Sequence, residues 1–372
     1  MIWLAWFIYG FLLLRLSVSL TNTFTRQWLK TWKKRNRLKT DDDGHFISIL
    51  IPARNEEQNI GLLLTDLVKQ DFERFEIIVY DDNSDDDTVQ VIKKQMNTDS
   101  RIKMINGTAL PPGWIGKTYA CHQLSLMAMG DYLLYLDADV RVKPSLLRNS
   151  MAHMDKHNLS LLSMFPRQIT VSTGEKITVP LMNWILLGLL PLILTRISGM
   201  VSFSAANGQF MLFRADIYHK FGFHKRVKGK MVEDIEIFRL MKKLKLRTHT
   251  ILGNNEISCR MYSNFHDAIA GFSKNVIDFF GGSGPIAVIF ALVTTFGFIP
   301  ALMFLPPLHV YLYLIAIVVN RMIISIISRQ SALHNIILAP LQQISLCLMI
   351  FAALRKKHRQ LLIWKGRNVY QP

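Results

Sequence analysis

From residue 45 onward, short apolar runs alternate with segments of helical spacing. The runs have the length and the β-branched or aromatic content of buried strands. The predicted strands cover residues 46–51, 75–80, 102–105 and 132–136. Apolar side chains three and four apart predict helices between them, at residues 60–68 and 117–129. This alternation predicts an α/β domain with a mostly parallel sheet, in which ligands bind at the carboxyl ends of the strands.

Another helix is predicted after the second strand, through Val89, Val91 and Ile92. Ser84 with an acid three residues later, Asp87, predicts a capping box at its start.

Both ends of the chain are apolar enough for membrane helices. Residues 1–20 carry a single charge, Arg15, and neither a basic leader nor a small-residue cleavage site, which predicts an uncleaved anchor with its N-terminus outside. Three more apolar runs cover residues 284–306, 308–328 and 335–354. If all three crossed, the basic tail would lie outside, against the positive-inside rule, so one run is predicted to be re-entrant or interfacial.

The apolar stretch at residues 181–195 contains Asn183 and Pro191 and is short for a span. We interpret it as an interfacial or buried helix, because a crossing would put the acidic motifs before and after it on opposite sides of the membrane. The predicted organisation is an anchor at 1–20, a basic juxtamembrane linker at 21–44, the α/β domain at 45–280, a membrane region at 281–354 and a basic cytoplasmic tail at 355–372.

Composition agrees with a membrane-associated protein that has a basic cytoplasmic face. The chain has 372 residues, half of them hydrophobic, and a formal net charge of +17. Much of this charge lies beside the terminal apolar runs, as in basic clusters that bind anionic headgroups on the cytoplasmic side. No base-stacking or groove-reading motif accompanies it, which argues against nucleic-acid binding. The three cysteines are far apart, which excludes a disulfide framework and a cysteine zinc site.

The strand predicted at residues 132–136 ends on two carboxylates, Asp137 and Asp139. Alternate residues of an extended chain point the same way, so both can face one point. Oxygen ligands of this kind suit a hard divalent cation, which commonly bridges to phosphates. The alternative is a solvated strand end with two surface acids.

Two polar loops follow the first two strands, at residues 52–57 and 81–88. The first, taken alone, is also compatible with a cap for the next helix. The second has the acid spacing of a calcium loop, but Asp86 replaces the required glycine and Ile92 takes the place of the bidentate glutamate. We therefore reject calcium binding, and Asp82 is a candidate acceptor of hydrogen bonds from a base or ribose.

Three more segments are candidates for the same site. Gly116 and Lys117 form a glycine turn with a lysine at a helix start, suited to a diphosphate, although a surface lysine is the alternative. Asn207, Gly208 and Gln209 would supply a close backbone approach and an amide. Glu233 and Asp234 open an amphipathic helix, where acids normally serve the helix dipole, but a carboxylate at the cleft is also a candidate general base.

The ordered set of motifs resembles glycosyltransferase family 2, over roughly residues 45–270. The motifs are Pro-Ala-Arg-Asn-Glu-Glu at 52–57, Asp-Asp-x-Ser at 81–84, Gly-Lys-x-x-Ala at 116–120, Asp-Ala-Asp at 137–139, Gly-Gln-Phe at 208–210 and Glu-Asp at 233–234. With the membrane segments and the late Trp-Lys-Gly-Arg, the chain is most similar to bacterial carotenoid- and hopanoid-associated glycosyltransferases. The resemblance implies the GT-A nucleotide-sugar fold.

The resemblance also implies roles for individual residues. The nucleoside would be held by Ala53, Arg54, Glu56 and Asp82, and the donor region by Lys117. Asp137 and Asp139 would serve the ribose, diphosphate and metal centre, with Asp139 the direct ligand of a divalent cation, Mn²⁺ or Mg²⁺. Asp234 would be the base of an inverting single displacement.

The chain departs from the family pattern in one respect. The Gln-x-x-Arg-Trp motif of processive synthases is missing, which argues against polymer synthesis. Trp364 and Arg367, or Arg260, would occupy part of its place, although a juxtamembrane tryptophan–arginine pair is also an ordinary interfacial anchor.

The function expected from the sequence is transfer of a sugar from a nucleoside-diphosphate donor, with a UDP-sugar as first choice, to a lipid such as a carotenoid or hopanoid. The catalytic domain would lie on the cytoplasmic face of the cell membrane. The alternatives are a polyprenyl-phosphate glycosyltransferase and a non-catalytic membrane protein that keeps the transferase fold as a binding scaffold.

Overall fold

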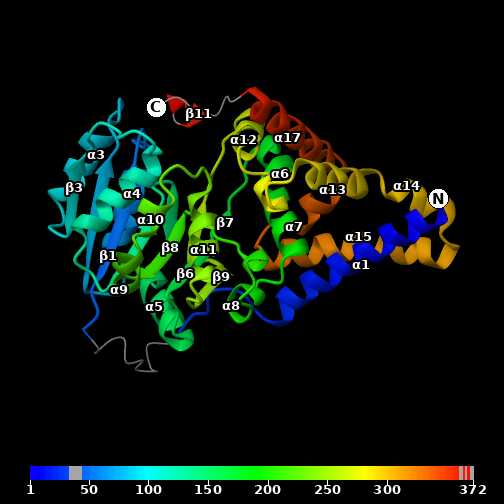
Figure 1. Ribbon diagram of the computed structural model, residues 1–372, viewed down its shortest axis with the longest axis horizontal. Coiled ribbons are helices and arrows are strands. Elements are labelled where there is room, and N and C mark those ends of the chain that lie inside the picture. Colours follow the sequence, from blue (N-terminus) through cyan, green and yellow to red (C-terminus); the bar gives the residue numbers. More distant parts are fainter. Residues whose placement is uncertain (33–43, 360–362, 365–366, 369–372) are drawn as a thin grey trace. The chain divides into compact units, whose positions relative to one another are not determined.

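The structure is a computed structural model that describes residues 1–32, 44–359, 363–364 and 367–368, with side chains as far as Lys356 (Figure 1). The chain divides into two compact units, which we call the helical unit and the sheet unit. The helical unit comprises Met1–Arg26, Gln168–Pro191 and Arg260–Leu362, and the sheet unit comprises Gln27–Arg167, Leu192–Cys259 and Ile363–Pro372.

A seven-stranded sheet forms the centre of the sheet unit. Its strands are β1 (Ile47–Ala53), β2 (Phe75–Asp81), β3 (Ile102–Asn106), β4 (Tyr132–Leu136), β6 (Leu161–Phe165), β8 (Phe210–Arg214) and β9 (Thr248–Leu252). The spatial order is β3–β2–β1–β4–β8–β6–β9. Four pairings are parallel, and only β8 runs antiparallel to its neighbours β4 and β6. The predicted α/β fold with a mostly parallel sheet is therefore confirmed.

Helices connect and cover these strands. They are α2 (Ile60–Val68), α3 (Thr88–Met96), α4 (Gly116–Met127), α5 (Leu146–His157), α8 (Leu194–Ile197), α9 (Ala215–Phe221), α10 (Phe223–Arg226) and α11 (Glu233–Lys243), with the 3-10 turn η2 (Val201–Phe203). Two short strands, β5 (Val140–Val142) and β10 (Ile257–Cys259), pair antiparallel. Strand β7 (Arg167–Gln168) falls where the chain passes from one unit to the other.

The predicted capping box at Ser84 is wrong. Helix α3 begins at Thr88 with Asp87 as its N-cap residue, and no side-chain hydrogen bond caps it. The Ser84 hydroxyl instead accepts a hydrogen bond from the backbone N–H of Asn55 at 3.0 Å. The serine therefore joins the two polar loops that follow β1 and β2.

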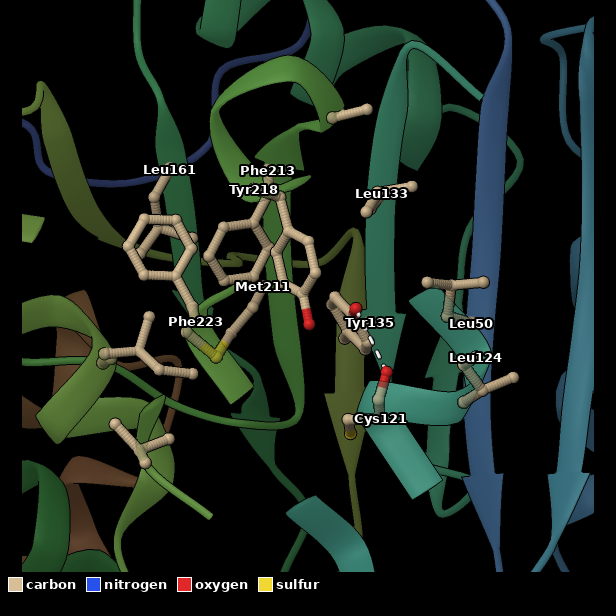
Figure 2. Packing of buried hydrophobic residues seen from close by; sticks show 14 of the residues in the cluster. Leu50, Cys121, Leu124, Leu133, Tyr135, Leu161, Met211, Phe213, Tyr218 and Phe223 are labelled. Carbon is tan, nitrogen blue, oxygen red and sulfur yellow. Dashed lines mark hydrogen bonds between the residues drawn. The ribbon is translucent and has the colours of Figure 1, made fainter. Parts of the chain in front are cut away.

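An aromatic core fixes the helices that carry the candidate site. Figure 2 shows Tyr135 of β4 and Phe213 of β8 packed with Tyr218 of α9 and Phe223 of α10. The Tyr135 hydroxyl donates to the carbonyl of Cys121 in α4 at 3.3 Å. Each buried aromatic side chain contributes about 1.5–3 kcal/mol to folding. Helices α4 and α11 both pack into this cluster, so the core holds their first turns rigidly relative to the sheet.

The helical unit consists almost entirely of helices. They are α1 (Ile2–Phe24), α6 (Thr173–Thr178), α7 (Pro180–Leu189), α12 (Phe265–Phe272), α13 (Gly284–Phe296), α14 (Phe298–Phe304), α15 (Pro307–Ile327), α16 (Ala332–Ile337) and α17 (Ala339–Arg359), with the 3-10 turn η3 (Asp278–Phe280). Helices α1 and α15 lie side by side (Figure 1).

Two helices in the described part of the chain, α1 and α15, are long and apolar enough to cross a membrane. The pair α13 and α14 makes a third candidate that is bent by 51°, as in a broken span or a re-entrant loop. Residues 181–195 form no single helix, because the chain breaks between α7 and α8 around Pro191, which cannot continue a helix. Helix α7 is largely buried and packs against α1 and α15.

Candidate active site

Strand direction brings the acidic motifs to one edge of the sheet. Strands β1, β2 and β4 are parallel neighbours, so their carboxyl ends lie at the same edge. Strand β8 runs the opposite way, which places Gln209, the residue before it, at that edge too. The backbone N–H of Asp137 donates to the carbonyl of Gln209 at 3.4 Å. Asp137 and Gln209 are 72 residues apart in the sequence, and they meet because β8 runs antiparallel to β4.

Lys117 connects two acids of the site. Its ammonium lies 2.7 Å from Oδ1 of Asp137 and 3.5 Å from Oε1 of Glu233. Burial alone would lower the pKa of Lys117, but the carboxylates of Asp137 and Glu233 hold it well above its ordinary value. The lysine is therefore a fixed positive charge at the first turn of α4, where the helix N-terminus also favours anions.

Asp139 lies beside an amide and a thiol. The Gln209 side-chain N–H₂ donates to Oδ1 of Asp139 at 3.4 Å and to Sγ of Cys259 at 2.9 Å. Cys259 reaches this place because β10 pairs with β5 directly after the Asp-Ala-Asp motif. Burial, followed by the charges of Asp137 and Glu56, raises the pKa of Asp139 to about 6. The carboxyl group of Asp139 thus lies in a partly desolvated place that also carries neighbouring negative charge.

Asp234 lies at the start of α11, on the other side of the glycine turn before β8. The backbone N–H of Gly208 donates to its Oδ2 at 2.9 Å. Burial and the neighbouring charge of Glu233 raise the pKa of Asp234 to about 7, although Lys117 acts in the opposite direction. A carboxyl group with this pKa can accept a proton at neutral pH.

Gly208 is the closest point between these groups. A Cβ at this position would lie 3.0 Å from the Lys117 ammonium, 3.4 Å from Oε1 of Glu233 and 3.7 Å from Oδ2 of Asp234. Gly208 thus contacts Asp234, the candidate base, and its neighbour Gln209 contacts Asp139. This turn and Lys117 combine the two acidic motifs into one site.

The loop after β1 borders the same site, since Glu56 contributes to the raised pKa of Asp139. The Arg54 guanidinium donates to the carbonyls of Asp82 and Asn83 and lies 3.5 Å from Asp85. Asp82 is buried, and its backbone N–H donates to the carbonyl of Ala53 at 2.8 Å. Arg54 therefore organises the loop after β2, and Ala53 and Asp82 lie side by side.

The residues at this edge suit a divalent cation that is partly coordinated by phosphate. Asp137 and Asp139 offer carboxylate oxygens, and Oε1 of Gln209 is buried without a hydrogen-bond donor among the described residues. Within the same residues, no group of three or more His, Cys, Asp or Glu side chains is arranged to hold a metal alone. Hard cations such as Mg²⁺ accept one or two carboxylates when substrate phosphates complete the shell. The donor set therefore fits.

Three further residues were predicted to bind the donor, namely Arg260, Trp364 and Arg367. Arg260 belongs to the helical unit, where its Nε donates to the buried Glu175 at 2.8 Å. The side chains of Trp364 and Arg367 fall outside the described residues, although their backbones pair as β11 (Ile363–Trp364) and β12 (Arg367–Asn368). The donor-binding roles of all three stay predictions.

Sequence reasoning missed Cys259 and Gly107. A Cβ on Gly107 would lie 2.5 Å from the carbonyl oxygen of Asp81, so the close approach of the chain after β3 to this acid requires glycine. Its position directly after a predicted strand was an available signal. Cys259 has no local signal, because its place depends on the pairing of β10 with β5.

Comparison with known proteins gives a match to one family model and a similarity of fold. Residues 48–222 match the family model described as glycosyl transferase family 2. The chain is similar to the 4,4'-diaponeurosporenoate glycosyltransferase of Staphylococcus haemolyticus, with 26% identity over 258 residues, which cover 68% of this chain and 66% of the relative. The enzyme of the same name from Staphylococcus aureus strain N315 is 26% identical over 291 residues, or 73% of this chain and 72% of the relative. The matched part thus spans about two thirds of these relatives' length.

Among solved structures, the chain is similar to a mannosyltransferase from Pyrobaculum calidifontis in complex with GDP-Man and Mn²⁺. The TM-score is 0.57 at 14% identity, over 95% of this chain and 99% of that one. The expected resemblance to carotenoid-associated relatives and the predicted GT-A fold are both confirmed.

Proposed function

We propose that this chain, whose residues 48–222 match the family model described as glycosyl transferase family 2, is a membrane-bound inverting glycosyltransferase. Its donor is a nucleoside-diphosphate sugar, with a UDP-sugar as first candidate, and its acceptor is a lipid. The observation that carries the proposal is the single site in which Lys117, Asp137 and Asp139 lie next to Asp234 across the Gly208–Gln209 turn. This site combines residues suited to binding a diphosphate and its cation with a carboxylate, that of Asp234, which can accept a proton.

The donor would lie along the carboxyl edge of β1, β2 and β4. Asp82 would accept hydrogen bonds from the nucleoside, and the Lys117 ammonium would contact the diphosphate. Asp137 and Asp139 would hold a divalent cation, which neutralises charge on a leaving diphosphate when it is bound. The Mn²⁺ in the Pyrobaculum mannosyltransferase agrees with this assignment.

Asp234 would take the proton of the acceptor hydroxyl as its oxygen attacks the anomeric carbon. The carbon–oxygen bond to the diphosphate breaks as the new glycosidic bond forms, which inverts the configuration. The pKa of about 7 keeps a large ionised fraction of Asp234 at neutral pH. Burial of the site and the rigid first turn of α11 support precise placement of this carboxylate, which is how positioning lowers a barrier.

The acceptor would reach the site from the bilayer. Helices α1 and α15 are long and apolar enough to cross a membrane. The curated relatives carry the name 4,4'-diaponeurosporenoate glycosyltransferase, so a carotenoid-like or other extended apolar acceptor is the first candidate. Asp234 would act as the base where the attacking group is a hydroxyl, whereas a carboxylate such as the one in that name is already ionised. A polyprenyl phosphate is the alternative acceptor, and an ionised oxygen of this kind would need no base.

Melting of the detergent-purified protein with UDP, GDP or dTDP, each with and without Mn²⁺, tests the donor site. A ligand at a hundredfold excess over its dissociation constant stabilises the folded state by about 2.7 kcal/mol. We expect one nucleotide to raise the melting temperature in the presence of Mn²⁺, and Asp139→Ala to abolish that increase. Asp216→Ala removes an exposed aspartate of the sheet unit and is the matched control. The absence of any increase would favour the binding-scaffold alternative.

Asp234→Asn tests the base. We expect this variant to keep the nucleotide-dependent increase and to lose sugar transfer, because the amide cannot accept the proton. Transfer at the wild-type rate would refute the assignment of the base and would point to an acidic acceptor.

A further inference from the structure

Two arginines are buried in the helical unit without an acidic partner. Arg15 of α1 is 3% exposed and Arg321 of α15 is 5% exposed. Among the residues that the structure describes, no aspartate or glutamate lies within ion-pair distance of either guanidinium. Burial of a charge is unfavourable unless the charge is paired and hydrogen-bonded. The two positive charges therefore lack a negative group.

Both guanidinium groups face the same indole ring. Cζ of Arg15 lies 3.9 Å from the ring centroid of Trp184 in α7, and Cζ of Arg321 lies 5.0 Å from it. The ring of Phe290 in α13 is 5.1 Å from Arg15. Cation–π contacts offset part of the cost of burial. They do not remove the repulsion between two like charges in a small, apolar volume.

Neutral acceptors satisfy only part of the donor capacity. A guanidinium carries five N–H donors. Within the described part of the chain, Arg15 makes one hydrogen bond, to the carbonyl of Trp184, and Arg321 makes two, to the carbonyl of Asn335 and to Oε1 of Gln342. Nε of Arg15 is buried and finds no acceptor among the described residues. The geometry thus leaves N–H groups for an additional anionic acceptor.

The two arginines lie about one helical turn apart along two parallel helices. Trp6 of α1 contacts His309 of α15 with ring centroids 4.9 Å apart, and further along both helices Ser19 donates to Asn320 at 2.6 Å. Arg15 and Arg321 therefore both lie in the half of the pair near the C-terminal ends of these helices. Ionisable residues inside membrane helices commonly mark a binding site or a pathway.

We propose that Arg15 and Arg321 form a binding site for the anionic head group of a lipid, a carboxylate or a phosphate on a long apolar chain. The planar fork of arginine suits the paired oxygens of both groups. The surrounding helices would contact the apolar chain, and the head group would supply the missing negative charge. The site lies in the helical unit alone, so it goes beyond the proposed transfer reaction and does not depend on it.

The first test uses the wild-type protein without any sugar donor. Binding of a radiolabelled long-chain carboxylic acid is measured in detergent, with a polyprenyl phosphate and an uncharged alcohol of equal chain length as competitors. We expect the acid and the phosphate to bind roughly ten- to hundredfold more tightly than the alcohol, as for hydrogen bonds to a charged group. Equal affinity for the acid and the alcohol would overturn the proposal.

Phosphatidylglycerol vesicles distinguish the source of the anion. Competition at the same concentration as the single-chain lipids would support the anion site and identify bulk phospholipid as its occupant. Failure to compete would support a site for single-chain ligands.

Substitutions then assign the site. Arg15→Gln and Arg321→Gln are expected to reduce the affinity for the acid about tenfold or more, to leave that for the alcohol unchanged, and so to abolish the preference for charge. Arg329→Gln removes an exposed arginine beyond the end of α15 and is the matched control. Should either Gln variant fail to fold, Arg321→Lys keeps the charge without the fork and is expected to retain part of the preference. An undiminished preference in folded Gln variants would overturn the proposal.

Discussion

The rate of sugar transfer should follow the ionisation of Asp234. Burial and the charge of Glu233 raise the pKa of this carboxyl group to about 7. If Asp234 is the base, only its ionised form is active, so kcat/KM rises with pH and levels off above the pKa. About half of the protein is ionised at pH 7 and about one eleventh at pH 6, so the rate at pH 6 is expected to be about fivefold lower than at pH 7.

The Glu233→Gln variant tests whether the midpoint of the pH profile of kcat/KM belongs to Asp234. The charge of Glu233 is the second cause of the raised pKa after burial, so its removal should move the midpoint to lower pH. Burial remains, which should keep the midpoint above the ordinary aspartate value. Asp139 also has a raised pKa, but the charges that raise it after burial are those of Asp137 and Glu56. A shift in the Glu233→Gln profile therefore reports on Asp234.

Initial rates at low acceptor concentration, between pH 5.5 and 8.5 at constant ionic strength, give both profiles. Nucleotide-dependent melting at each pH shows whether donor binding is intact across the range. A flat wild-type profile would refute the general-base role. A midpoint that moves to higher pH in Glu233→Gln would refute the electrostatic explanation.

Two predictions concern stability. Gly107→Ala would bring a Cβ to 2.5 Å from the carbonyl oxygen of Asp81, so we expect the free energy of unfolding to fall by about 1–3 kcal/mol, with a lower melting temperature. Gly199→Ala is the control, because a Cβ there would have nothing within 4 Å. Equal melting temperatures of the two variants would contradict the reasoning. Despite its burial, hydrogen bonds from Arg260 and Ser172 lower the pKa of Glu175 to about 2, below its ordinary value of 4.5. The stabilisation is therefore present above pH 4.5 and lost as pH falls toward 2. Glu175→Gln should melt earlier than wild type at pH 7, and this difference should shrink as the pH falls below 4.5; a pH-independent difference would contradict it.

Local patterns in the sequence predicted the strands and the position of the acidic motifs at their carboxyl ends, because both depend on short-range signals. Short apolar runs predict β1 to β4. The acids at the ends of β1, β2 and β4 lie at one edge of the sheet because these strands are parallel. The error at Ser84 has a physical reason: the hydroxyl has two possible partners, and the backbone N–H of Asn55 on a neighbouring loop is the one it takes. No local rule predicts a contact between two loops.

Long-range pairings account for what the sequence could not predict. Cys259 reaches Gln209 because β10 pairs with β5, and the two strands are more than a hundred residues apart. The same holds for the contact of Lys117 with Glu233, because α4 and α11 pack into the same core cluster although more than a hundred residues separate them in the sequence. A motif identifies which residues to consider, and the fold decides which of them share a partner.

The balance of charge at the site gives a reason for dependence on a cation. Five acids influence it, namely Glu56, Asp137, Asp139, Glu233 and Asp234, and the charge that opposes them most directly is that of Lys117. Burial is the first cause of the raised pKa values of Asp139 and Asp234, and the neighbouring carboxylates raise both values further. A nucleoside diphosphate would add further negative charge to this edge of the sheet. Under the proposed function, the donor would therefore bind best together with a positive charge beyond Lys117, and the carboxylate oxygens of Asp137 and Asp139 are where a divalent cation would supply it.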